Sequence, residues 1–388
     1  MNFPLHAYVR ALKRSGASEQ FIQQVRDKAK PLVATGLPVI LTLGQLSFAT
    51  EIPYRILLSI IGRAVDPYRL FSIRKRAGGR RFICVPEPRM MFAQRWIHQN
   101  ILSAPSVTAG MSCAAMAYKN SASHVANARA HLASDWILKL DVTRFFESVS
   151  ERQVYHVFHS LGYPALVAFG LARLCTRVSF GSRGGRHPGA SARWSSRDRY
   201  DFLGYPDLGH LPQGAPSSPM LANLVCIPLD SQIEKIAEEH NLVYTRYADD
   251  LTLSGSLIGA DETLEVIRKV SNSLGQFGFG VNVRKTRVVR RGTRMIVTGL
   301  SVEGETLRVP RDYKDRLRQE LYYIEKFGLR EHCQRIGQRN YAAYLRRLSS
   351  RIGYVSCIEP ATGKKLEAKF TNLFPGFGEL KELILSFP

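Results

Sequence analysis

The stretch from Leu242 to Ser254 reads Leu-Val-Tyr-Thr-Arg-Tyr-Ala-Asp-Asp-Leu-Thr-Leu-Ser. Two short runs of β-branched, aromatic and aliphatic residues flank a polar turn, which predicts a β-hairpin. The turn carries two adjacent carboxylates, Asp249 and Asp250, which repel each other unless a cation lies between them. Because Mg²⁺ prefers carboxylate oxygens together with substrate phosphates, the hairpin predicts a magnesium site. A solvated acidic turn is the alternative.

A third carboxylate, Asp141, lies near the end of the apolar run Trp136–Val142, which predicts a buried strand. A strand and a hairpin that lie side by side in one antiparallel sheet would bring Asp141, Asp249 and Asp250 together. Two Mg²⁺ ions held there would be about 3.5–4 Å apart. One ion would activate a primer hydroxyl, and the other would hold a triphosphate and stabilise the leaving pyrophosphate.

The charge balance of the chain is strongly basic. Its 388 residues include 54 lysines and arginines against 32 aspartates and glutamates, a net charge of +22 at pH 7. This surplus favours a polyanionic partner, most simply a nucleic acid, with an anionic membrane surface as the competing interpretation. No apolar run reaches the roughly 18 residues of a spanning helix, and no secretory signal is evident at the N-terminus. We therefore expect no membrane partner.

Cysteine and histidine spacing gives little support to a zinc or redox site. The six cysteines are dispersed and form no Cys-x-x-Cys pair, which indicates reduced thiols in a cytoplasmic protein. His156 and His159 lie three residues apart on an expected helix and could share a metal ion. Surface or packing histidines are the simpler expectation for that pair.

The remaining pattern predicts mixed helices and strands without strict alternation, which favours the α+β class over a doubly wound sheet. Strands are expected at 68–85, as a hairpin with a Gly78-Gly79 turn and a basic tip, and at 295–302. A Gly-, Ser- and Arg-rich loop or insertion is expected at 179–209. Helices are expected at about 1–66, 90–102, 151–178, 218–240, 261–277 and from 311 onward.

Several blocks of this chain resemble, in order and spacing, the palm motifs of reverse transcriptases. They are Asp141–Phe146 (DVTRFF), Leu211–Pro219 (LPQGAPSSP) and Tyr247–Asp250 (YADD), followed by Asn282–Thr286 (NVRKT). The resemblance covers about residues 68–302. It implies a right-hand polymerase with fingers, a palm whose antiparallel sheet packs on helices, and a helical thumb. The implied regions are an N-terminal helical region at 1–66, fingers at 67–135, the palm at 136–305 and an RNA- or duplex-binding thumb at 306–388.

Two short blocks resemble a particular bacterial group, the retron reverse transcriptases. Asn127–His131 (NARAH) resembles their Asn-Ala-x-x-His block, and Val297–Gly299 resembles their Val-Thr-Gly block. The resemblance implies synthesis of branched RNA-linked single-stranded DNA (msDNA) from dNTPs. A structured non-coding RNA would supply the template and a guanosine 2′-hydroxyl primer, and an RNA–DNA hybrid would form. It also implies a bacterial cytoplasmic enzyme that acts with a separate effector protein in defence against phage.

The resemblance also implies roles for single residues. Asp141, Asp249 and Asp250 would hold the two Mg²⁺ ions, and Lys285 would approach the pyrophosphate and protonate it. Phe146 would exclude ribonucleotides because its ring fills the space of a 2′-hydroxyl. Two cations of the fingers, Lys75 and Arg81, would clasp the triphosphate. Two loop residues, Gln213 and Gly214, would border the nucleotide and the template.

The two retron-like blocks leave more than one role open. Asn127 and His131 lie four residues apart and would share a helix face. They would contact nucleic acid or serve as capping or buried hydrogen-bonding groups. Thr298 and Gly299 would lie near the primer end or recognise RNA, and an ordinary turn explains them nearly as well.

Three other functions compete with this interpretation. A group II intron or diversity-generating reverse transcriptase is one, although the chain lacks the Cys/His-rich endonuclease tail that many group II intron enzymes carry. An RNA-binding scaffold that restrains a toxic effector is the second. A membrane-surface protein is the third and most remote.

Overall fold

The computed structural model describes residues 5–74, 78–120, 122–178 and 208–376. The chain forms two compact units. The first unit comprises residues 1–122, 139–252 and 258–287, and the second comprises 123–138, 253–257 and 288–388. No helix within the described ranges combines the length and the apolar content needed to cross a membrane.

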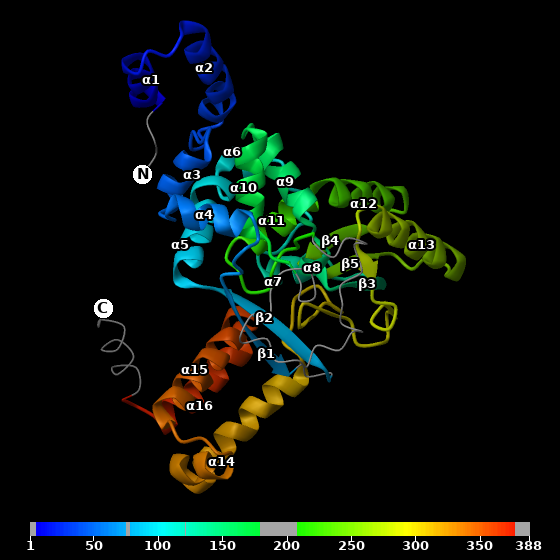
Figure 1. Cartoon of the computed structure of the whole chain (residues 1–388). Helices are drawn as coiled ribbons and strands as arrows, with labels where there is room; N and C mark the ends of the chain where they lie inside the picture. The colour runs from blue at the N-terminus through cyan, green and yellow to red at the C-terminus, as the bar shows by residue number, and fades with distance from the viewer. Residues whose placement is uncertain (1–4, 75–77, 121, 179–207, 377–388) are drawn as a thin grey trace. The chain divides into compact units, whose positions relative to one another are not determined.

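The first unit opens with the expected helices, α1 (Leu5–Arg14), α2 (Glu19–Ala34), α3 (Leu43–Thr50) and α4 (Tyr54–Ile61). The next two elements are strands, β1 (Tyr68–Arg74) and β2 (Arg80–Pro86), which pair antiparallel with Tyr68 opposite Pro86 and Arg74 opposite Arg80. Gly78 and Gly79 both have positive φ angles, +89° and +81°, which glycine adopts without steric cost. The predicted hairpin at 68–85 is therefore confirmed (Figure 1).

Helices make up most of the remainder of the first unit, and one prediction there was wrong. The predicted single helix at 218–240 is two helices, α11 (Ser218–Val225) and α12 (Ile227–Glu239). Pro228 lies in the first turn of α12, where a helix does not need its missing N–H. In the middle of one continuous helix the same proline would break the hydrogen-bond ladder. The other helices are α5 (Pro88–Ile97), the π-helix η1 (His98–Leu102), α6 (Pro105–Thr108), α8 (Phe145–Ser148), α9 (Glu151–Ser160), α10 (Ala165–Cys175) and α13 (Ala260–Gln276).

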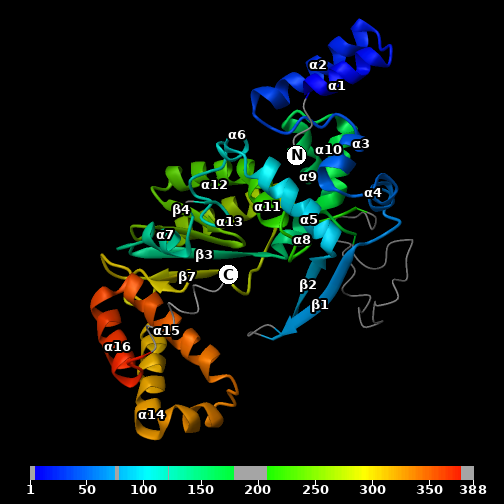
Figure 2. The same cartoon turned by 90° about the vertical axis from the view of Figure 1, so that its left-hand side faces the viewer.

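A five-stranded sheet carries the acidic residues singled out above. It contains β3 (Trp136–Thr143), β4 (Val243–Tyr247), β5 (Asp250–Gly255), β6 (Gly280–Val281) and β7 (Arg287–Arg290). The strand order is β4-β5-β3-β6, and β7 also pairs with β3. In the first unit, α12 and α13 lie on one face of the sheet (Figure 1, Figure 2). The predicted strand and hairpin are therefore neighbours in one sheet.

The second unit has its own apolar core. It contains α7 (His124–Arg129), the short strands β8 (Ile296–Val297) and β9 (Leu300–Ser301), and the helices α14 (Arg311–Arg335), α15 (Tyr341–Ile358) and α16 (Pro360–Leu373). Leu300, Leu321 and Leu348 are each 1% exposed or less within this core. Gly328 interrupts α14 with a φ of +77°. Helices together with antiparallel strands confirm the expected α+β class.

Candidate active site

The acidic hairpin turn has the geometry of a tight connection between β4 and β5. Strand β4 ends at Tyr247 and β5 begins at Asp250. Ala248 lies between them with a φ of +59°, a left-handed conformation that costs an alanine free energy, and its side chain is buried. Surrounding contacts must hold such a turn in place, because the residue itself does not favour it.

Strand β3 brings Asp141 to this turn. The N–H of Val142 donates to the carbonyl oxygen of Asp249 at 2.8 Å. Burial raises the pKa of Asp249, and the negative charges of Asp141 and Asp250 raise it further. The pKa of Asp250 is likewise raised, first by burial and also by Asp141. The three carboxylates are therefore close enough to repel one another.

Two lysines offset this negative charge. Lys285 Nζ lies 2.7 Å from one carboxylate oxygen of Asp141, and the amide of Asn282 donates to the other at 3.1 Å. Lys139 Nζ lies 3.9 Å from the carboxylate of Asp250. The sequence predicts that Lys285 approaches the pyrophosphate. In the structure Lys285 contacts Asp141, a carboxylate beside which the pyrophosphate would be held.

The donor chemistry of these carboxylates fits a divalent ion. Carboxylates that lie close enough to repel each other gain from a shared cation, and oxygen is the ligand that Mg²⁺ prefers. Asp141 is 16% exposed and Asp250 is 39% exposed, so ligands from solvent can reach both. In their present side-chain positions, no three histidine, cysteine or acidic groups of the described residues are arranged to hold a metal ion.

A fully enclosed ion pair supports the hairpin. Arg246 is 1% exposed, and its guanidinium donates to both carboxylate oxygens of Asp230 at 2.7 and 2.6 Å. The Tyr244 hydroxyl donates to the same carboxylate at 2.9 Å, and Arg246 also donates to the carbonyl of Ala248 at 3.4 Å. Because Ala248 directly precedes Asp249, the buried pair holds the backbone that presents the carboxylate.

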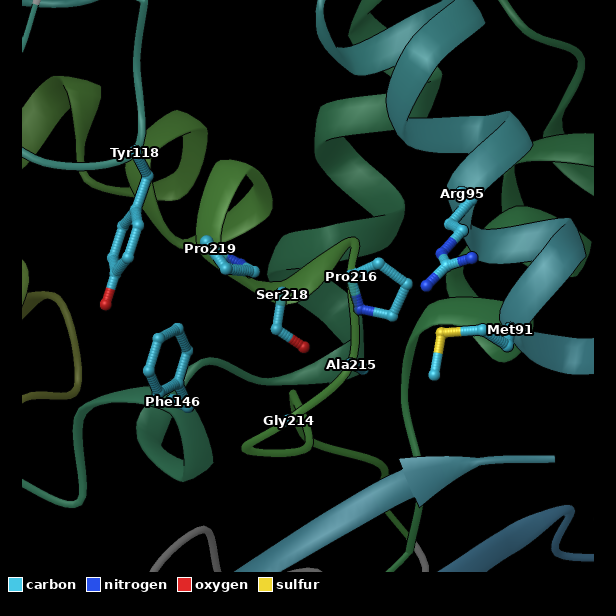
Figure 3. A pocket seen from close by; sticks show the side chains of 9 residues that line it. All are labelled: Met91, Arg95, Tyr118, Phe146, Gly214, Ala215, Pro216, Ser218 and Pro219. Atoms are coloured by element: carbon cyan, nitrogen blue, oxygen red, sulfur yellow. The ribbon is translucent and has the colours of Figure 1, made fainter. Parts of the chain in front are cut away.

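A pocket of about 410 Å³ lies within the first unit (Figure 3). The rings of Tyr118 and Phe146 form one side of it, and Met91 and Arg95 form the other. The residues between these two sides come from the loop and helix start at Gly214, Ala215, Pro216, Ser218 and Pro219. The sequence singled out Phe146 and Gly214; it gave no signal for Tyr118, Met91 or Arg95, which stand in unremarkable surroundings.

Gly214 is required by its backbone and by its neighbours. Its φ is +113°, and a Cβ there would lie 2.8 Å from Ile83 Cγ2 and 3.1 Å from the carbonyl oxygen of Cys84. The carbonyl of Gln213 accepts a hydrogen bond from the N–H of Cys84 at 2.7 Å. The loop therefore lies directly against β2, the strand that also carries the exposed Arg81. Lys75 and residues 179–207 of the predicted insertion lie outside the described residues.

The two retron-like blocks lie against each other in the second unit. Thr298 has a φ of +44°, unusual for a β-branched residue, and its hydroxyl donates to the carbonyl of His124 at 2.7 Å, at the start of α7. Gly299 follows with a φ of +87°. The strained turn at 298–299 thus holds the helix that carries Asn127.

Burial bears on the roles expected of Asn127 and His131. Their side chains are 1% and 0% exposed. His131 Nδ1 lies 2.7 Å from the Ser254 hydroxyl on β5. Both side chains therefore face the interior, as in the buried alternative that the sequence left open, and their part in nucleic-acid recognition stays a prediction.

Asparagine at position 249 is expected to raise the melting temperature at neutral pH without divalent ions. The raised pKa of Asp249 means that the folded state binds this proton more tightly than the unfolded chain does, so stability falls as pH rises from the ordinary value of 3.8 through the raised one. The amide removes that penalty. Thermal unfolding between about pH 4 and 8 should show a gain that grows with pH; a pH-independent difference would contradict it.

Comparison with known proteins shows which family this chain resembles. Residues 73–303 match the family model of reverse transcriptase (RNA-dependent DNA polymerase). The retron Ec86 reverse transcriptase of Escherichia coli is 30% identical over 342 residues, which cover 85% of this chain and 93% of that protein. The retron Mx162 reverse transcriptase of Myxococcus xanthus is 31% identical over 326 residues, covering 79% and 61%. A telomerase structure from Candida albicans aligns with a TM-score of 0.44 at 12% identity, covering 87% of this chain and 66% of that one.

The family match spans more than half of the chain and includes both strands that carry the carboxylates. The Escherichia coli relative is matched over nearly its whole length. The chain therefore belongs to the reverse transcriptase family, among its retron members, and is an RNA-directed DNA polymerase.

Proposed function

We propose that this enzyme makes msDNA, a branched single-stranded DNA linked to RNA. A structured non-coding RNA would supply the template and, through the 2′-hydroxyl of an internal guanosine, the primer. The proposal extends the retron family assignment. We assign residues 67–135 to the fingers, 136–305 to the palm and 306–388 to the thumb, after the helical region at 1–66.

One observation carries the chemistry of this proposal. The hydrogen bond from Val142 to Asp249, together with the raised pKa values of Asp249 and Asp250 beside Asp141, indicates that the three carboxylates lie close together where β3 meets the β4–β5 turn. These three side chains would hold two Mg²⁺ ions, which when bound neutralise the triphosphate and favour deprotonation of the primer hydroxyl.

The surrounding side chains would bind and select the nucleotide. Lys285, which contacts Asp141 in the structure, would exchange that contact for the leaving pyrophosphate and would donate a proton to it. Arg81, with Lys75, would grip the triphosphate. Phe146 would occupy the space of a 2′-hydroxyl, and the bare backbone of Gly214, beside Gln213, would let nucleotide and template approach closely.

The net charge of +22 suits a large RNA partner and an RNA–DNA hybrid, because each phosphate that a lysine or arginine neutralises releases counterions. We place Thr298 and Gly299 near that RNA, with Asn127 and His131 supporting them from the interior. A bacterial cytoplasmic enzyme that works with a separate effector protein in phage defence is the biological role we propose, by kinship alone.

Nucleic acid that copurifies with the enzyme tests the proposal. The enzyme is expressed with the genomic region around its gene, and the bound nucleic acid is sequenced before and after debranching and ribonuclease treatment. We expect DNA joined to an internal RNA nucleotide through a 2′ linkage, and RNA alone from the double variant Asp249→Asn with Asp250→Asn. DNA joined to no RNA would overturn the branched product, and RNA without DNA from the unaltered enzyme would favour the scaffold function.

A further inference from the structure

The aromatic side of the pocket contains a second ring beside Phe146. The ring centroids of Tyr118 and Phe146 are 6.2 Å apart with an interplanar angle of 47°. Both rings border the same cavity (Figure 3). Phe146 also meets Phe145 at 5.5 Å, which in turn stacks on Phe279 at 5.7 Å. Phe146 thus contacts both a buried aromatic stack and the exposed ring of Tyr118.

The backbone holds Tyr118 in a conformation that tyrosine does not favour. Its φ is +62° and the residue remains 42% exposed, so burial of the ring does not account for the strain. Contacts on the N-terminal side impose it. The buried amide of Asn223 donates to the carbonyl of Ala117 at 2.8 Å, and Met116 N–H donates to the carbonyl of Arg246 at 2.8 Å. The same Asn223 accepts from the Arg246 side chain at 3.1 Å.

Tyr118 also lies within electrostatic reach of two charged groups of the proposed nucleotide site. Burial, followed by the negative charge of Asp249, raises the pKa of the Tyr118 hydroxyl, whereas Arg81 lowers it. The ring is therefore near one of the proposed metal-binding carboxylates and near a cation proposed to hold the triphosphate. It borders the region that the nucleotide would enter.

We infer that Tyr118 is a specificity-determining positioning residue whose ring keeps Phe146 in the place where a 2′-hydroxyl would otherwise fit. This inference rests on the proposed role of Phe146 as the barrier to ribonucleotides. Without Tyr118, the Phe146 ring can turn toward the 410 Å³ pocket and leave that place open. Selection of the sugar therefore depends on both rings. The strained backbone at Tyr118 holds its ring against the ring of Phe146.

The test measures sugar discrimination, the ratio of kcat/KM for a dNTP to that for the matching ribonucleotide, by single-nucleotide extension of an RNA-templated primer. Tyr118→Ala retains a Cβ, so both residues face a similar backbone cost at positive φ and the substitution reports mainly on the ring. It should lower the ratio about three- to tenfold, because this factor corresponds to the free energy with which an aromatic pair stabilises its two rings. Tyr118→Phe should keep the ratio of the unaltered enzyme, because the ring and not the hydroxyl acts on Phe146.

A double-mutant cycle separates bracing from an independent effect. Once Phe146→Ala has removed the barrier, adding Tyr118→Ala should change the ratio little. Tyr54→Ala on α4, a tyrosine of similar exposure, should leave the ratio unchanged. Tyr118→Leu, with melting curves for every variant, replaces the alanine variant if that protein is unfolded.

The outcomes distinguish the inference from the function on which it rests. An unchanged ratio in Phe146→Ala would overturn the proposed role of Phe146 itself. A lowered ratio in Phe146→Ala with an unchanged ratio in Tyr118→Ala would overturn only the bracing role. Effects of the two substitutions that multiply in the double variant would also overturn it, because the rings would then act separately.

Discussion

Replacement of Asp249 by asparagine is expected to slow nucleotide addition about a thousandfold or more. The substitution keeps the shape of the side chain and removes one of the three neighbouring carboxylate charges that we propose bind the metal ions. Stabilisation of transition-state charge by a metal pair is worth several kcal/mol, and about 4 kcal/mol corresponds to a factor of a thousand. Single-turnover extension at saturating dNTP measures the rate of the chemical step directly.

A matched control separates this effect from a general change of surface charge. Asp261→Asn removes one carboxylate from the exposed first turn of α13. Surface substitutions of this kind usually change stability little, and we expect the rate to stay within about twofold of the unaltered enzyme. Melting curves should show that Asp249→Asn is folded. A rate for Asp249→Asn within tenfold of the unaltered enzyme would remove this carboxylate from the metal-binding set.

Breaking the buried pair beneath the hairpin is expected to have the largest effect on stability. Asp230→Asn leaves the Arg246 guanidinium charged and enclosed, which typically costs about 3–5 kcal/mol of unfolding free energy. In the unaltered enzyme burial lowers the pKa of Arg246, and Cys226 and Asp230 raise it by more, so the pair is charged. The guanidinium stays protonated in Asp230→Asn because arginine is in effect always charged in proteins. Urea unfolding should show the loss as a lower midpoint with an unchanged slope.

A double variant tests whether the loss arises from the unpaired charge. Asp230→Leu combined with Arg246→Met replaces both charges by apolar groups and should recover most of the stability lost in Asp230→Asn. Nucleotide addition should remain slower in the double variant, because the hydrogen bond from Arg246 to the carbonyl of Ala248 is gone. A double variant as unstable as Asp230→Asn would show that volume, shape and the unpaired Tyr244 hydroxyl, not charge, determine the loss.

Local residue patterns were sufficient for many elements of this fold. Alternation and turn chemistry predicted the hairpin of β1 and β2, and apolar periodicity predicted the N- and C-terminal helices. These features follow from neighbours within a few residues, which a sequence displays directly. The prediction of one helix at 218–240 was wrong for a local reason as well. The apolar periodicity continues through Pro228, but a proline in the interior of a helix kinks or breaks it.

The family and its three carboxylates could likewise be predicted, because ordered motifs identify them. Their partners could not. Nothing near Lys285 in the sequence indicates that it contacts Asp141. Nothing near Arg246, in an apolar hairpin strand, indicates that Asp230 lies opposite it in the interior. Tyr118 stood in an unremarkable segment, although the structure places its ring against Phe146.

The sequence by itself therefore determined the class of fold, the order of its helices and strands, and the acidic chemistry of the site. Those properties depend on residue type and short spacing. Only the tertiary structure decided which groups neutralise the carboxylates, which buried charges hold the hairpin and which ring stands beside Phe146. Those contacts join residues up to 144 positions apart, and they exist only after the strands and helices have packed together.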